Sequence, residues 1–254
     1  AAAYPDFFRV VPSDALQGQA LSAVVSADMP ANGTVGLVHM TNAYGSGLAD
    51  AFTADFTADG TALCTTIGYE ETMTDFSAAV QSMADSGCTS AVLVSYAADG
   101  GMIIDEMAAQ GWSGQVYGGD GIAEEGLATD ATSSVNGIIA TKPASAATGE
   151  VGYVFAALCA QNPDCAGGIY TAEAFDGIVL VALAAFAQLA SPGATLSQVI
   201  MATGQGLAGA SGDISFMANG DVPGAGYCVG DFTEDADGVS FDCNRSWDPV
   251  NGMS

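Results

Sequence analysis

GLVHMTNAYGSGLADAF (residues 36–52) opens the stretch that decides the fold. It continues through TALCTTIGYEETMTDFSAAVQSMADSG (61–87), CTSAVLVSYAADGGMIIDEMAAQG (88–111) and WSGQVYGGDGI (112–122). Apolar runs typical of strands alternate here with runs whose apolar residues recur at helical spacing. The alternation predicts an α/β fold with a doubly wound, mostly parallel sheet, because right-handed crossovers place helices on both faces.

The pattern also predicts where the individual elements lie. Strands are expected at residues 35–40, 62–68, 91–95 and 137–141, and helices at 14–27, 47–58, 75–86 and 101–110. Ligands of open parallel sheets bind beyond the carboxyl ends of the strands. Function is therefore expected at four short segments, residues 41–44, 69–71, 95–99 and 118–121.

The composition is strongly acidic, with 29 Asp and Glu against three Lys and Arg and a net charge of −26. Such a field repels phosphate backbones, which excludes nucleic-acid binding. Half of the residues are apolar, which argues against disorder and indicates an acidic surface over a substantial core. The acidity suggests adaptation to high salt, where charge repulsion is screened, or a compositional bias of the lineage.

The six cysteines are even in number, include no CxxC pair and accompany a single histidine, so disulfides fit better than zinc. Fifteen connectivities are possible. Local reasoning favours one of them: Cys159–Cys165 around an Asn-Pro-Asp turn, Cys228–Cys243 across a hairpin, and Cys64–Cys88 as the remaining pair.

Beyond residue 143 the strands give way to helices, expected at residues 152–160, 171–190 and 196–202. The small residues 144–149 are typical of a linker. A strand at 214–217 and a hairpin over 227–243 close the chain. The apolar run 177–190 is too short for a membrane span and predicts a buried helix. The sequence has no initiator methionine and no signal peptide, so we expect a mature or truncated chain.

Several runs resemble the type 1 periplasmic binding proteins, in particular the branched-chain amino-acid (Leu/Ile/Val) group of ABC-transporter substrate-binding proteins. In order along the chain they are FFRVVPSDALQGQAL, VGLVHMTNAYGSGLADAF, DFSAAVQSMADSGCTSAVLVSY, MAAQGWSGQVYGGDG, YTAEAFDGIVLVALA and GDISFMANGDV. They cover nearly the whole sequence. The resemblance implies the periplasmic binding protein-like fold with two lobes.

The resemblance also implies that most of the first lobe is missing, since the family has more than a hundred residues before the run that resembles FFRVVPSD. Residues 11–141 with 212–247 would form a complete second lobe. Residues 1–10 and 144–210 would be the mainly helical remnant of the first. The loops that hold a ligand carboxylate in the family would then lie outside this sequence, and we expect the chain as given to bind ligand weakly or not at all.

Four positions match the family's ligand-binding residues. Tyr44 in AYGSGL and Tyr96 in VSYAADGG would cover the ligand, with a surface turn and packing under a loop as their respective alternatives. Asp120 would pair with the ligand's ammonium group, with a solvated turn as the alternative, and the backbone of Gly121 would lie against the ligand. Asp99 is expected to cap a helix.

Other chemistries find little support in the sequence. His39, the only histidine, is expected to be a core or wall residue, and no serine has a GxSxG setting, which disfavours a secreted hydrolase. The run Asp235-Ala-Asp-Gly238 fails the calcium-loop spacing and predicts a hairpin turn. The glycines around Asp120 lack the lysine of a phosphate loop.

The resemblance therefore predicts a periplasmic or extracellular solute-binding protein that captures a small amino acid for the permease of an ABC transporter. It allows a lipid anchor in the full-length form. We expect no enzymatic activity, no cofactor or metal and no direct membrane insertion. The alternative is a sensory ligand-binding domain of the same fold in a receptor.

Overall fold

The computed structural model of the chain describes residues 6–144, 149–162, 165, 169–236 and 238–254. The chain divides into two compact units. The sheet unit comprises Asp14–Lys142 and Tyr227–Ser254, and the helical unit comprises Ala1–Ser13 and Pro143–Gly226.

The sheet unit is built around β1 (Val35–Met40), where the sequence predicts it. All but one of its residues are buried, as expected for a strand covered on both faces. It pairs in parallel with β2 (Thr65–Tyr69) and β3 (Ser90–Val94), and the parallel pairing continues through β4 (Gln115–Gly118) to β5 (Ile139–Pro143).

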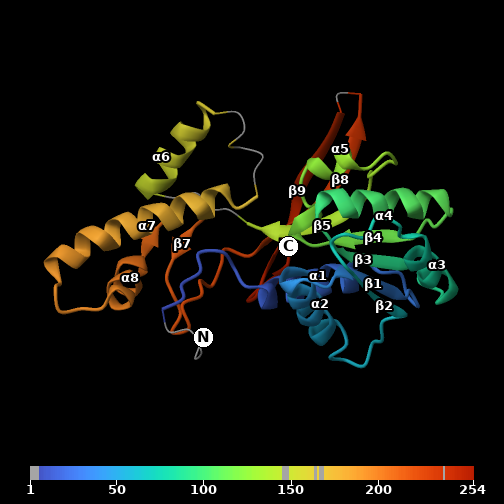
Figure 1. The fold of residues 1–254 in the computed structure, drawn as a ribbon, viewed down its shortest axis with the longest axis horizontal. Helices are drawn as coiled ribbons and strands as arrows, with labels where there is room; N and C mark the ends of the chain where they lie inside the picture. The colour runs from blue at the N-terminus through green and yellow to red at the C-terminus, as the bar shows by residue number, and fades with distance from the viewer. Residues whose placement is uncertain (1–5, 145–148, 163–164, 166–168, 237) are drawn as a thin grey trace. The chain divides into compact units, whose positions relative to one another are not determined.

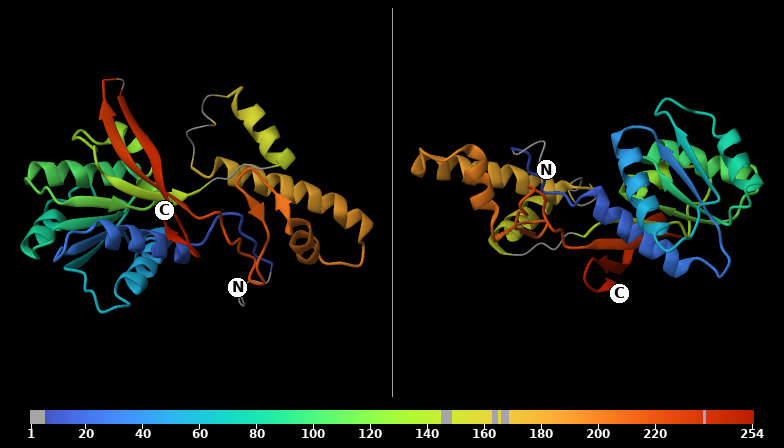
Figure 2. Two further views of the ribbon diagram at one scale, coloured as in Figure 1. Left: turned by 180° about the vertical axis from the view of Figure 1, so that it is seen from behind. Right: turned by 90° about the horizontal axis from the view of Figure 1, so that it is seen from below.

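The far side of this sheet is antiparallel, formed by β8 (Tyr227–Asp235), β9 (Gly238–Asp248) and β10 (Gly252–Met253). The eight strands follow the order β10-β9-β8-β5-β4-β3-β1-β2 (Figure 1). The predicted hairpin is the long ribbon of β8 and β9, drawn in red in Figure 2. The expectation of a mostly parallel α/β sheet is confirmed.

Helices cover both faces of this sheet. Successive residues of a strand point to opposite faces, so neighbouring residues pack against different helices. On β3, Val92 and Val94 pack with α1 (Asp14–Asp28) and α2 (Ala43–Phe56) in one core cluster. Ala91 and Leu93 pack in the other cluster, with α3 (Ser77–Asp85), α4 (Ala97–Ala109) and α5 (Gly126–Asp130) (Figure 1).

The helical unit contains α6 (Gly149–Cys159), α7 (Thr171–Ala190) and α8 (Leu196–Gly204), with a small antiparallel pair of β6 (Leu207–Ala208) and β7 (Asp213–Ile214). Its core centres on Leu180, Ile214, Phe216 and Val222. Residues 145–148 of the predicted linker lie outside the described residues.

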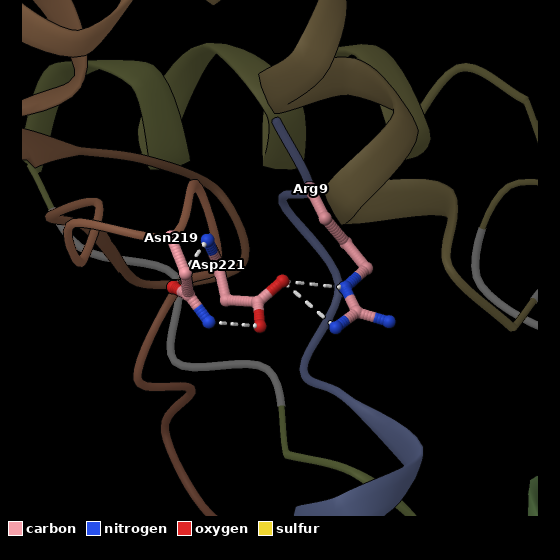
Figure 3. Close-up of polar contacts among 3 residues, drawn as sticks. All are labelled: Arg9, Asn219 and Asp221. Atoms are coloured by element: carbon pink, nitrogen blue, oxygen red, sulfur yellow. Dashed lines mark hydrogen bonds and ion pairs between the residues drawn. The ribbon is translucent and has the colours of Figure 1, made fainter. Parts of the chain in front are cut away.

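An ion pair fixes the first described residues of the helical unit to a distant turn. The Arg9 guanidinium donates through Nε (3.0 Å) and Nη2 (2.7 Å) to Oδ1 of Asp221, and Asn219 Nδ2 donates to the other carboxylate oxygen at 2.8 Å (Figure 3). Arg9 and Asp221 also form an isolated β-bridge. Residues 7–11 form no strand beyond this bridge.

The prediction that residues 177–190 form a buried helix is wrong. These residues belong to the 20-residue helix α7, whose apolar side chains Ile178, Phe186 and Leu189 are 72%, 74% and 80% exposed. Within residues 177–190, the buried apolar side chains are those of Leu180 and Ala184, because the rest of the helical unit packs on one side of α7 only. Within the described part of the chain, α7 is the one helix long and apolar enough to cross a membrane, a test that core helices of soluble proteins also pass.

The boundary between the units also differs from the expected lobe boundary. Residues 11–13 and 212–226 were expected with the second lobe but lie in the helical unit. For residues 212–226, the pairing of β6 with β7 and the Arg9–Asp221 ion pair explain the difference, because both contacts tie this segment to the helical unit.

All six cysteines are paired as the local reasoning predicts. The bridges are Cys64–Cys88, Cys159–Cys165 and Cys228–Cys243, with Cα–Cα distances of 5.8, 5.1 and 5.5 Å. The first joins the residues just before β2 and β3, and the last joins β8 to β9.

Candidate functional site

The candidate site lies at the carboxyl ends of four neighbouring parallel strands, β4, β3, β1 and β2. Each strand is followed directly by one of the segments that the sequence singles out. The site is therefore built by chain connectivity, since parallel strands bring their carboxyl ends to one edge of the sheet.

Tyr44 lies in the first turn of α2, which begins earlier than the predicted helix start at residue 47. The earlier start is explained by the cap: the Asn42 side chain accepts a hydrogen bond from the Gly45 N–H at 2.8 Å. Tyr44 is thus held on a helix rather than in a loop. Its ring packs partly against both core clusters of the sheet unit.

The Tyr44 hydroxyl links two of the other predicted site residues. It donates to Oδ1 of Asp120 at 3.0 Å and accepts from the Gly121 N–H at 3.1 Å. Burial, followed by the nearby Asp120 charge, raises the pKa of Tyr44 well above its ordinary value. The hydroxyl therefore stays protonated and can act as a fixed donor toward the carboxylate.

Asp120 is only 5% exposed, so the alternative of a solvated turn residue is wrong. It begins a short 3-10 helix, Asp120–Ile122, directly after β4. A carboxylate held away from water interacts strongly with any charge placed beside it, because little solvent screens the interaction. Asp120 and Asp99, which caps α4, are both buried acids at this edge of the sheet.

Gly121 is required by close approach of the chain. A Cβ atom at this position would lie 2.4 Å from the Ser95 carbonyl oxygen and 2.9 Å from the Tyr44 hydroxyl. Any side chain would push the segment after β4 away from the end of β3. Its N–H donates to Tyr44 in this structure.

Tyr96 joins the same group from the end of β3. Its ring stacks on that of Tyr44, with centroids 5.3 Å apart and an interplanar angle of 13°, and 47% of the residue is exposed. Tyr96 is the N-cap of α4, and its backbone N–H donates to Oδ1 of Asp99 at 3.1 Å, so Asp99 caps the helix as predicted. The structure therefore brings all four predicted residues together.

A buried polar network beneath Tyr96 was not assigned from the sequence. The Tyr69 hydroxyl contacts Ser95 Oγ at 2.8 Å and also hydrogen-bonds the Asp99 carboxylate. Burial and then the bond to Asp99 raise the pKa of Tyr69. The network fixes Asp99 and through it the backbone of Tyr96. The position of Tyr69 at a strand end was the available signal.

Gln17 is a second residue that sequence reasoning missed. It lies on α1, is 3% exposed, and donates from Nε2 to the Thr141 carbonyl at 3.1 Å. This bond ties α1 to β5 beside the end of β4. Nothing in the spacing of the surrounding sequence distinguishes Gln17 from a surface glutamine.

The remaining candidates behave as the residue chemistry suggests. His39 lies within β1, and its Nδ1 is 2.8 Å from the Met40 carbonyl, as fits a wall residue. The Asp235-to-Gly238 segment turns β8 into β9, with Asp237 outside the described residues. Among the residues that the structure describes, no group of three or more His, Cys, Asp or Glu side chains could hold a metal ion.

Comparison with known proteins places this site in context. The family model described as periplasmic binding protein matches residues 1–152. The Leu/Ile/Val-binding protein homolog 3 of Brucella melitensis biotype 1 is 30% identical over 119 residues, covering 46% of this chain and 31% of the relative. The chain thus matches about a third of the length of that curated relative.

Solved structures share the fold at low sequence identity. The leucine-binding protein LivK of Thermotoga maritima is 19% identical with a TM-score of 0.76, covering 95% of this chain and 68% of LivK. A solute-binding protein of an ABC transporter from R. palustris, in complex with 4-hydroxybenzoate, is 15% identical with a TM-score of 0.73, covering 95% and 67%. Because the family model spans more than half of the sequence, the chain belongs to the periplasmic binding protein family.

Proposed function

We propose that this chain is the ligand-binding part of an extracytoplasmic solute-binding protein that captures a small amino acid and delivers it to the permease of an ABC transporter. The observation that carries the proposal is the buried Asp120 carboxylate, held by Tyr44 at the carboxyl edge of the parallel strands. The family is one of solute-binding proteins rather than enzymes.

Asp120 favours a ligand with an ammonium group. A charge-assisted hydrogen bond between an ammonium and a buried carboxylate contributes about 1.5–3 kcal/mol. A ligand whose only charge is a carboxylate, such as the 4-hydroxybenzoate of the R. palustris protein, would instead meet a like charge at this position. An amino acid therefore fits Asp120 better than an aromatic acid does.

Tyr44 and Tyr96 would supply the apolar part of the site. Their stacked rings form a flat surface next to Asp120, and the Tyr96 ring is still about half exposed. An aliphatic side chain laid on this surface would bury apolar area without requiring further polar partners. The pair of rings thus supports a ligand such as leucine or isoleucine.

The helical unit would belong to the first lobe of the clamp. The exposed apolar residues of α7 support this assignment, because a helix face of this kind is normally covered. The chain covers only 68% of LivK. The remaining part of a two-lobed protein would cover α7 and supply the loops that hold the ligand carboxylate. Ligand binding would then close two lobes about a hinge.

The proposal can be tested by NMR titration of the 254-residue chain with leucine, isoleucine and 4-hydroxybenzoate. Leucine should shift the amide signals of Tyr44, Tyr96 and Gly121, with a dissociation constant of about 1 mM or weaker because one lobe supplies all the contacts. Asp120→Asn should weaken leucine binding at least about tenfold, the equivalent of about 1.4 kcal/mol. Tyr96→Ala should weaken it too.

Asp50→Asn is the matched control, since Asp50 is an exposed acid on α2 in the same unit. It should leave leucine binding unchanged. The proposed site is wrong if Asp120→Asn and Tyr96→Ala bind leucine as the unchanged chain does. Tighter binding of 4-hydroxybenzoate than of leucine would refute the ligand class.

A further inference from the structure

The helical unit contains a cavity of its own, with a volume of about 280 Å³. Apolar side chains form much of its wall, among them Val10, Ile214 and Val222. Val10 and Val222 directly follow the two residues of the Arg9–Asp221 ion pair, which therefore joins two segments of the cavity wall. The wall is thus held by a defined contact between distant segments.

One buried acid lines this cavity. Glu173, in the first turn of α7, is 3% exposed and belongs to the lining. Burial raises the pKa of its carboxyl group, its own backbone N–H opposes that rise, and the nearby Asp176 adds to it. An ionised carboxylate in such surroundings is costly unless a donor or a cation accompanies it.

Asp176, one turn further along α7, is a buried acid of the same unit whose carboxylate is fully hydrogen-bonded. It is fully buried, and its carboxylate accepts hydrogen bonds from the Ala210 N–H (2.7 Å), the Ser211 N–H (2.7 Å) and Ser211 Oγ (2.6 Å). These bonds fix the loop after β6 to α7. Asp176 therefore has a structural role that Glu173 does not share.

The protein supplies no ion-pair partner for Glu173 within its described residues. The two ion pairs found there are Arg9–Asp221 and Arg245–Asp28. Arg9 is the only Lys or Arg in the sequence of the helical unit, and both hydrogen bonds of its guanidinium go to Asp221. The other acid of the lining, Asp213, is exposed and bonds Ser215.

We propose that this cavity binds a small aliphatic ammonium compound, with the ammonium group against Glu173 and the aliphatic part against Val10, Ile214 and Val222. The cavity volume suits a ligand of a few carbon atoms, somewhat below the size of drug-binding pockets. The site lies wholly in the helical unit and does not depend on the amino-acid site of the sheet unit.

The test is an NMR titration of the full 254-residue chain at constant ionic strength with butylammonium as the probe. Neutral 1-butanol and anionic butyrate serve as matched compounds. Butylammonium should shift the amide signals of Ser211, Ile214 and Val222 with a dissociation constant of about 1–10 mM, as expected for five heavy atoms. Butanol should bind at least about tenfold more weakly and butyrate not at all.

Two variants make the result specific. Glu173→Gln keeps the shape of the side chain and should reduce butylammonium affinity at least about tenfold, to that of butanol. Ala225→Leu narrows the cavity without changing its charge and should weaken both compounds. Because it leaves Glu173 in place, it also tests the site if Glu173→Gln does not fold.

Glu150→Gln is the control, because it removes an exposed acid from the same unit and changes the net charge equally. It should bind butylammonium unchanged. The proposal is overturned if Glu173→Gln binds butylammonium as before, or if butanol binds equally well. It is also overturned if Asp120→Asn abolishes the shifts instead, since the probe would then occupy the amino-acid site.

Discussion

The sheet unit and the helical unit differ in how completely their apolar side chains are covered. In the sheet unit, helices cover both faces of the sheet, and β3 is buried at every residue. In the helical unit, α7 presents Ile178, Phe186 and Leu189 to solvent. A helix that is apolar on all sides is normally buried on all sides, whereas other residues of the helical unit pack against only one side of α7.

The two units also differ in net charge. The sheet unit carries 22 of the 29 acidic side chains and a net charge of −20, whereas the helical unit carries −6. An acidic surface over a closed core is typical of a unit that faces water. The comparison teaches that the sheet unit covers both faces of its sheet, while α7 of the helical unit leaves an apolar face exposed.

The largest effect is expected from matched phenylalanine truncations in the two units. Phe52 is fully buried on α2, so Phe52→Ala should lower the free energy of unfolding of the sheet unit by about 3–5 kcal/mol. Phe186→Ala, at an exposed position of α7, should change stability by less than about 0.5 kcal/mol.

Urea unfolding measures the first variant well, because both tryptophans, Trp112 and Trp247, lie in the sheet unit and report its unfolding. Amide hydrogen exchange along α7 measures the second. Equal losses of stability for the two variants would show that α7 is covered in solution and would remove the contrast between the units.

A medium effect is expected at Gly121 in the candidate site. A Cβ atom there would lie 2.4 Å from the Ser95 carbonyl oxygen, so Gly121→Ala should cost about 1–3 kcal/mol of stability by overpacking. The displaced segment should also separate Asp120 from Tyr44 and weaken leucine binding. Gly60→Ala is a poor control because of its positive φ, whereas Gly193, with open space around it, is a suitable one.

The smallest effect is expected from Glu173 and depends on pH. Its folded-state pKa is raised, so ionisation opposes folding. Stability should be lost as pH rises from the ordinary value of 4.5 through the raised value, and Glu173→Gln should lack this loss. Asp176 and Asp213 face the same region and are present in both proteins, so the difference between the two proteins isolates Glu173.

Hydrogen exchange of the α7 amides, measured between pH 4 and 8, provides that difference. Glu173→Gln should become increasingly protected relative to the unchanged chain as the pH rises. A constant difference would mean that Glu173 ionises in the folded protein as easily as in the unfolded one, and the burial of its carboxyl group would then have no energetic consequence.

Much of the fold could be predicted from local patterns. β1 and α7 have the predicted bounds, since each is a long apolar run between turn residues. The starts of α2 and α4 were placed four residues too late, because residues with weak periodicity precede the apolar faces of both helices. Asp99 was expected to cap a helix, whereas the Asn42 cap of α2 was not. Capping is a side-chain interaction that periodicity does not register.

The sequence by itself determined the parallel sheet, the cysteine pairing and the positions of Tyr44, Tyr96, Asp120 and Gly121 at strand ends, because all of these follow from local spacing and chain connectivity. Only the tertiary structure decided that Tyr44 bonds Asp120, that Tyr69 supports Asp99, and that Glu173 lines a cavity while Asp176 is saturated. Those distinctions depend on which distant groups meet, and burial is a property of the packed chain rather than of any residue in it.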